Sequence, residues 1–193
     1  MDSDGYLSQL ADIFNGITVN TPSISAIIAI ALAGVLLLAS GFASASEIAF
    51  FSLSPSDRND IDERNHPSDD KISALLGDTE RLLATILITN NFVNVTIIML
   101  CNFFFMNVFV FHSPLAEFLI LTVILTFLLL LFGEIMPKIY SAQKTLAFCR
   151  FSAPGIYFLE KVFRPIATVL VRSTTFLNKH FVKKSHNISV DEL

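Results

Sequence analysis

Hydrophobic positions along the chain gather into three long runs, separated by segments rich in polar residues. Charged side chains are absent from residues 24–46, 82–111 and 118–133. A helix needs roughly 20 consecutive apolar residues to cross a bilayer. The pattern therefore predicts an all-α membrane protein with a three-span core at residues 23–138. We place the spans at about residues 24–51, 82–111 and 115–137.

The composition supports a membrane protein. Hydrophobic residues make up 53% of the 193 residues, with 19 Phe and no Trp, and the mean hydropathy is +0.63. A soluble domain of this size cannot bury so much apolar surface.

Apolar residues recur at helical spacing through residues 139–184, interrupted by basic residues and by Pro154 and Pro165. Basic amphipathic segments of this kind lie in the headgroup region of a bilayer and favour anionic lipids. We expect two or three amphipathic juxtamembrane helices here, broken at the prolines.

The basic residues set the expected orientation. Residues 1–57 contain none, four lie between the first two spans, and nine follow the third. By the positive-inside rule, the N-terminus lies outside and the C-terminus lies in the cytoplasm. We expect an integral protein of the bacterial inner membrane.

The segments outside the spans are polar. Residues 1–22 are predicted to form an external lead-in, and residues 54–81 a cytoplasmic loop, helical at about 55–64 and 70–76. Residues 185–193 are predicted to be a linker to C-terminal domains absent from this chain.

The first span carries Ser44, Ser46 and Glu47 near its end. Polar groups inside a bilayer are costly, so they are candidates for function. Ser44 and Glu47 are three residues apart and share a helix face. The alternative is that the serines are small residues that let helices pack closely.

The second span carries Asn90, Asn91 and Asn94, whose spacing gathers amides on one side of a helix. They are candidate ion ligands. The alternative is that they form hydrogen bonds between helices and serve packing alone.

The third span ends in Gly133, Glu134, Pro137 and Lys138. Proline has no N–H, so in a helix Pro137 leaves the Gly133 carbonyl without its usual donor. An unpaired carbonyl beside a carboxylate is suited to replacing the water around a cation. The alternative is an ion pair between Glu134 and Lys138, one turn apart.

The three clusters supply hydroxyl, amide, carbonyl and carboxylate oxygens, and all four histidines lie outside the spans. Hard oxygen donors suit Mg²⁺ or Na⁺ and argue against zinc, copper or iron. No nucleophile elbow, metalloprotease motif or phosphate loop is present in the sequence, so we expect neither an enzyme nor a nucleic-acid-binding protein.

Three stretches together resemble the transmembrane domain of the CorB/CorC and cyclin-M (CNNM) magnesium transporters, known as DUF21. They are "GFASASEIAFFSLSPSD" at 41–57, "ERLLATILITNNFVN" at 80–94 and "GEIMPK" at 133–138. The resemblance covers about residues 24–180. This chain has Thr89 where the family often has Gly before its asparagine pair, and Ala45 where Gly is usual.

The resemblance implies a homodimer that binds dehydrated Mg²⁺ between its helices and exports it by alternating access, coupled to Na⁺. It implies that Ser44, Asn90, the Gly133 carbonyl and Glu134 are ligands. It further implies that four other matching polar residues support these ligands, form a Na⁺ site or are ligands themselves: Ser46, Glu47, Asn91 and Asn94.

ATP enters this expectation only through CBS domains, which usually follow in the family and are absent here. The alternative function is a membrane-anchored scaffold or sensor with a structural cation. Transport predicts a solvated cavity lined by the ligands, whereas a scaffold predicts that these polar groups pair with one another in a dry interface.

Overall fold

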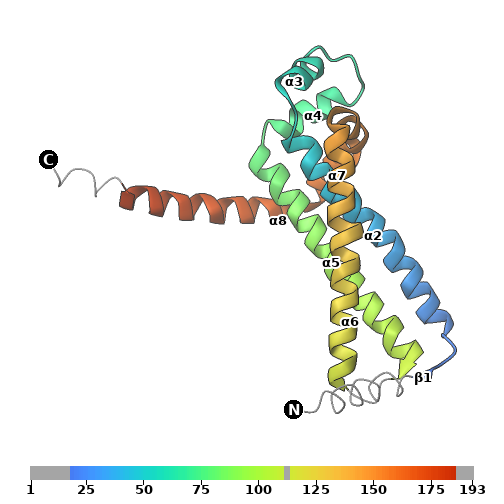
Figure 1. The fold of residues 1–193 in the computed structure, drawn as a ribbon. Helices are drawn as coiled ribbons and strands as arrows, with labels where there is room; N and C mark the ends of the chain where they lie inside the picture. Colours follow the sequence, from blue (N-terminus) through green and yellow to red (C-terminus); the bar gives the residue numbers. More distant parts are fainter. Residues whose placement is uncertain (1–17, 111–113, 186–193) are drawn as a thin grey trace, which may run out of the picture. The chain divides into compact units, whose positions relative to one another are not determined.

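The computed structural model describes residues 18–110 and 114–185 and confirms the all-α class, apart from one pair of two-residue strands (Figure 1). Most of the predicted lead-in and linker lies outside the described residues. In chain order the elements are β1 (Thr18–Val19), α2 (Ile24–Phe51), α3 (Pro55–Asp62), α4 (Asp69–Leu76), α5 (Thr79–Val108), β2 (Phe109–Val110), α6 (Pro114–Leu128), the π-helix η1 (Leu129–Ile135), α7 (Met136–Gln143) and α8 (Thr145–Ser185).

Three helices are long and apolar enough to cross a membrane: Ile24–Phe51, Thr79–Val108 and Glu117–Gln143. This confirms the three long apolar helices predicted from the uncharged runs. The third is built from α6, η1 and α7 in succession. Helices α3 and α4 occur where the polar loop was predicted to be helical.

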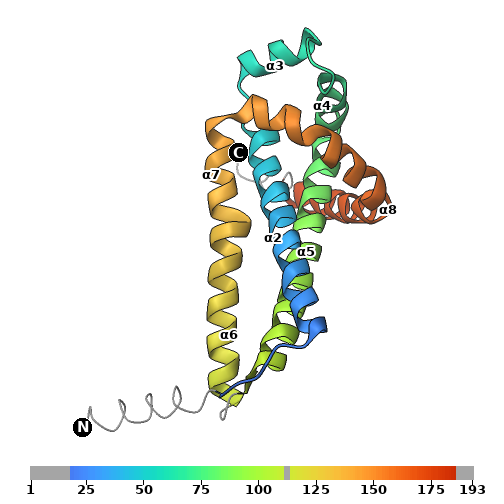
Figure 2. The ribbon, with the colours of Figure 1, turned by 90° about the vertical axis from the view of Figure 1, so that its right-hand side faces the viewer.

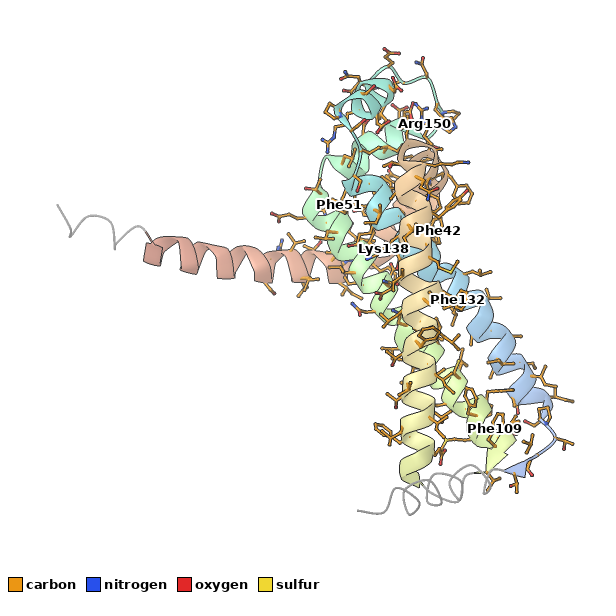
Figure 3. The ribbon with its side chains drawn as sticks, in the orientation of Figure 1. Phe42, Phe51, Phe109, Phe132, Lys138 and Arg150 are labelled. Atoms are coloured by element: carbon orange, nitrogen blue, oxygen red, sulfur yellow. The ribbon has the colours of Figure 1, made fainter. Side chains whose placement is uncertain are left out.

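The chain forms two compact units. Unit 1 comprises Met1–Phe42 and Asn91–Pro137, and unit 2 comprises Ala43–Asn90 and Lys138–Leu193. In unit 1 the buried core consists of small and branched side chains from α2, α5 and α6, namely Ala33, Val93, Ile97, Cys101 and Leu125. β1 pairs antiparallel with β2 at the end of unit 1 where Phe109 lies (Figure 3).

In unit 2, α4 lies beside the beginning of α8 (Figure 2). An ion pair between Asp69 and Arg150 holds the two helices together, and Arg150 is labelled in Figure 3. Asp69 is fully buried, and its carboxylate accepts from Arg150 at 2.9 Å (Nε to Oδ1) and 3.1 Å (Nη2 to Oδ2). The backbone N–H of His66 donates to the same carboxylate at 2.9 Å.

The surroundings of this ion pair shift three pKa values. Burial raises the pKa of Asp69, but the hydrogen bonds from Arg150 and His66 outweigh it and hold the pKa below its usual value. The hydrogen bond to Asp69 raises the pKa of Arg150. Burial raises the pKa of the neighbouring Cys149 thiol to about 12. The polar loop is therefore anchored by a buried charge, which the sequence pattern did not indicate.

The prediction that the juxtamembrane helices break at the prolines is wrong. α8 runs as one helix from Thr145 to Ser185, with Pro154 and Pro165 inside it. A proline removes one backbone hydrogen bond and bends a helix, but the helix continues when its apolar face stays packed. The packed face of α8 includes Cys149, Ile156 and Ala167, which are fully buried.

Candidate functional site

Unit 1 brings polar groups from α2 and α5 together at Ser40 and Asn94. The hydroxyl of Ser40 donates a hydrogen bond of 2.7 Å to Oδ1 of Asn94, and Ser40 is fully buried. Asn94 is one of the amides singled out from the sequence. Ser40 was missed, although it lies one helical turn before Ser44, and that spacing was the signal that could have found it.

The third apolar helix approaches this hydrogen bond closely because two glycines lie in the contact. A Cβ atom at Gly133 would lie 3.1 Å from Oγ of Ser40. A Cβ atom at Gly41 would lie 3.0 Å from Cγ of Pro137 and 3.3 Å from the carbonyl oxygen of Phe132. Small residues allow such close approach between helices. All three apolar helices therefore contribute to one polar cluster in unit 1.

The backbone departs from α-helical geometry in this part of unit 1. Residues Leu129–Ile135 form a π-helix, and the N–H of Met136 donates to the carbonyl oxygen five residues earlier. Pro137 has no N–H, so it cannot donate to Phe132 in π spacing or to Gly133 in α spacing. π-Helical turns are frequent at functional sites. The sequence pattern indicated only the Gly133 carbonyl as free of a donor, and the π-helix adds the carbonyl of Phe132.

Glu134 lies within this π-helix, and its side chain is half-buried. Among the described residues of unit 1, its carboxylate has no hydrogen-bond or ion-pair partner. The Nζ of Lys138 lies 3.1 Å from Oε2 of Glu47 within unit 2. Lys138 therefore neutralises Glu47, for which the resemblance implied a role in supporting the ligands, in a Na⁺ site or as a ligand.

Unit 2 brings Ser44 and Asn90 together. Nδ2 of Asn90 donates to Oγ of Ser44 at 3.1 Å, and Ser44 is fully buried. Beside this pair, Oγ of Ser141 donates to the carbonyl oxygen of Ala45, the residue after Ser44, at 2.7 Å, which ties α7 to α2. Two of the four predicted ligands thus form one hydrogen-bonded pair, and the other two, Gly133 and Glu134, belong to unit 1.

The remaining predicted residues lie in different surroundings. Ser46 is fully buried in α2, whereas Asn91 is exposed on α5. In unit 2, Oγ1 of Thr85 is a buried hydroxyl oxygen with no hydrogen-bond partner among the residues described. A buried polar atom without a partner calls for an explanation, such as a water or an ion. Its position in an apolar run hid it from the sequence argument.

The candidate cation ligands in both units are oxygen atoms. Within residues 18–110 and 114–185, no group of three or more His, Cys, Asp or Glu side chains is arranged to hold a metal ion. Ligands for a cation in these segments would therefore have to include hydroxyl, amide and carbonyl oxygens, which favour Mg²⁺ and other hard cations.

The family is decided by comparison with known sequences. The profile of the family described as "Cyclin M transmembrane N-terminal domain" (CNNM) matches residues 30–193. The chain belongs to this family. CNNM membership agrees with the three long apolar helices and with the resemblance drawn from the three polar motifs.

Two proteins similar to this CNNM domain are bacterial. The "UPF0053 protein sll1254" of Synechocystis sp. is 26% identical over 140 residues, which are 72% of this chain and 39% of that protein. A "UPF0053 protein" of Haemophilus influenzae is 29% identical over 136 residues, which are 70% of this chain and 31% of that protein. The chain thus matches 39% of the length of the first relative and 31% of the length of the second.

CNNM membership makes this chain a membrane domain of a family associated with Mg²⁺ transport.

Proposed function

We propose that this CNNM domain is the membrane part of a Mg²⁺ exporter, with Glu134 as the charged ligand of the transported ion. The observation that supports this most is the burial of Glu134 together with its lack of a partner. Its carboxylate is half-buried in an apolar helix without a partner in the described part of unit 1. An intramembrane carboxylate left unpaired is costly, and a cation would offset that cost.

The backbone beside Glu134 supports the same role. The π-helix and Pro137 leave the carbonyls of Phe132 and Gly133 without a donor from Pro137. Mg²⁺ requires near-octahedral oxygen coordination and gives up its water reluctantly, so carbonyl oxygens must replace that water. We assign the Gly133 carbonyl as a ligand, with the Phe132 carbonyl as a further candidate.

Ser44 and Asn90 are the proposed ligands from unit 2. Their hydrogen bond fixes both side chains, and Asn90 donates through Nδ2. The amide oxygen Oδ1 is the atom through which Asn90 would bind a cation, and Ser44 would bind through Oγ. A ligand pair held in place by its own hydrogen bond loses little conformational entropy on binding.

Coupling to Na⁺, alternating access and export from the cytoplasm belong to the same proposal. Asn94 and Ser46 are proposed to support the ligands or a Na⁺ site, and Glu47 is proposed to act through its ion pair with Lys138. We also propose that the domain works as a homodimer, with its N-terminus outside and its C-terminus in the cytoplasm.

The proposal is tested by Mg²⁺ efflux from loaded proteoliposomes under a Na⁺ gradient. Glu134→Ala is expected to abolish efflux, whereas Glu117→Ala, which removes a carboxylate near the other end of the same apolar helix, is expected to leave it unchanged. Efflux that survives Glu134→Ala would refute the ligand assignment. Efflux that persists without Na⁺ would refute the coupling.

A second candidate function is a scaffold or sensor with a structural cation. The observation in its favour is that Ser44 and Asn90 pair with each other and that Ser44 is fully buried. This function predicts that Mg²⁺ raises the thermal stability of the protein while no ion crosses the membrane. Efflux and stability measured on the same preparation separate the two functions.

A further inference from the structure

A cavity of about 230 Å³ lies in unit 2. It is lined by residues of α4, α5 and α8 and by Asp78, which lies between α4 and α5. It is outside the polar clusters described above and contains none of the proposed Mg²⁺ ligands. The side chains that give it its character are charged or aromatic: Asp78, Arg81, Tyr157, Glu160, Lys161 and Arg164.

One arginine neutralises much of the negative charge in this cavity. The Nη2 of Arg81 lies 2.9 Å from Oδ2 of Asp78, and its Nη1 lies 3.7 Å from Oε1 of Glu160. Three cationic side chains face only two carboxylates in this cavity. The positive charge that remains is carried by Lys161 and Arg164.

Lys161 and Arg164 keep their hydrogen-bond donors available. The Nζ of Lys161 lies 4.6 Å from the centre of the Tyr157 ring, an interaction that holds the ammonium group without accepting its hydrogen bonds. Arg164, one turn further along α8, is exposed, and its guanidinium has no partner among the described residues. An ammonium and a guanidinium with free donors one turn apart suit a phosphate group.

The size of the cavity limits the ligand. Sites for drug-sized molecules occupy roughly 300–1,000 Å³, and this cavity is smaller. It can take a phosphate and a short polar group attached to it, such as the glycerol phosphate of a lipid headgroup.

The neighbouring surface favours a lipid as the source of that phosphate. Helices α5 and α8 also form a second hollow of about 190 Å³, lined by Leu83, Ala84, Leu87, Leu170 and Val171 together with Glu80. Along α8, Phe158, Val162, Ile166 and Val169 are exposed at helical spacing. An amphipathic helix with such a face lies in the membrane interface, where headgroup phosphates are at hand.

We propose that this cavity is a specific site for the phosphate of an anionic phospholipid, with Lys161 and Arg164 binding the headgroup and the apolar hollow taking part of an acyl chain. The proposal does not depend on Mg²⁺ transport. It goes beyond a general attraction of basic residues to the membrane, because it names one cavity and two side chains.

Native mass spectrometry of the purified protein, released from nanodiscs of phosphatidylglycerol and phosphatidylcholine, tests the proposal. Wild type is expected to retain phosphatidylglycerol selectively. The double variant Lys161→Gln/Arg164→Gln is expected to bind it about tenfold more weakly or worse. Arg172→Gln removes an exposed basic residue of α8 outside the cavity and is expected to retain the lipid.

Three results would overturn the proposal or its lipid part. Retention by the double variant, or equal loss in Arg172→Gln, would show that the cavity is not a specific site. Displacement of the lipid by millimolar inorganic phosphate would assign the cavity to soluble phosphate and overturn the lipid part. Since both substituted side chains are exposed, an unchanged unfolding temperature serves as the check that the double variant is folded.

Discussion

Asp69→Asn is the substitution whose effect the structure predicts most sharply. The change keeps the shape of the side chain and removes its charge. Asp69 is fully buried and accepts hydrogen bonds from both Nε and Nη2 of Arg150 and from the backbone of His66. An asparagine would turn an N–H₂ group toward one of these donors, so at least one of the three hydrogen bonds would be lost.

The magnitude follows from the burial of the two side chains: Asp69 is fully buried, and Arg150 is 23% exposed. Removing one partner of a buried ion pair destabilises a protein by about 3–5 kcal/mol, because the other charge is left uncompensated. Asp70→Asn provides the matched control. Asp70 lies 3.4 Å from Arg64, but the two side chains are 74% and 71% exposed. Pairs exposed to solvent contribute roughly 0–1 kcal/mol. Asp69→Asn should therefore lower the free energy of unfolding several-fold more than Asp70→Asn does.

The buried thiol of Cys149 provides the assay. It lies next to Arg150 in the chain, it is fully buried, and its pKa is raised to about 12 by burial. In a Cys101→Ala background, thiol labelling at neutral pH therefore reports how often this part of unit 2 opens. A loss of 3–5 kcal/mol should accelerate labelling by about two to nearly four orders of magnitude.

Labelling of Asp69→Asn at the same rate as Asp70→Asn would refute this reasoning. It would mean that the ion pair does not hold α4 to α8. Arg150→Lys should fall between wild type and Asp69→Asn, since a lysine keeps the charge but loses the two parallel hydrogen bonds of the guanidinium.

Three further predictions concern other features of the two units. Gly41→Ala should lower the unfolding temperature in detergent because its Cβ meets Pro137 at 3.0 Å, whereas Gly34→Ala, with nothing within 4 Å, should not; equal effects would contradict the close contact. Ser40→Ala should cost about 1 kcal/mol of stability through the lost hydrogen bond in unit 1, and an unchanged unfolding temperature would argue against that bond. Asp69 contributes stability above its usual pKa of about 3.9, and this stability is lost as pH falls through its lowered pKa in the folded protein. Asp69→Asn should therefore flatten the acid side of the profile of unfolding free energy against pH. An unaltered profile would count against the ion pair.

The fold was largely predictable because hydrophobic periodicity and the absence of charge decide where apolar helices form. The prolines of α8 show the limit of that reasoning. Pro154 and Pro165 are strong local signals for a break, but the buried face of the helix continues through both. Tertiary packing outweighs a local preference of this kind, and a sequence does not display packing.

The residue types of the candidate site were predictable from the sequence, but its backbone geometry and some of its contacts were not. The pairing of Ser44 with Asn90 connects two motifs that the sequence had already singled out. The π-helix was not predictable, because Leu129–Ile135 has the composition of an ordinary apolar helix. The pairing of Lys138 with Glu47 rather than with Glu134 also depends on which helices meet, and spacing along one helix cannot reveal it.

The central claim is that Mg²⁺ binds through the carboxylate of Glu134. The most direct measurement is a Mg²⁺-binding isotherm of the purified protein, recorded for wild type, Glu134→Gln and the control Glu117→Gln. Loss of a charged ligand is expected to weaken binding by about tenfold or more in Glu134→Gln, while Glu117→Gln binds as wild type does. Equal affinity in all three proteins would contradict the assignment of Glu134 as the ligand.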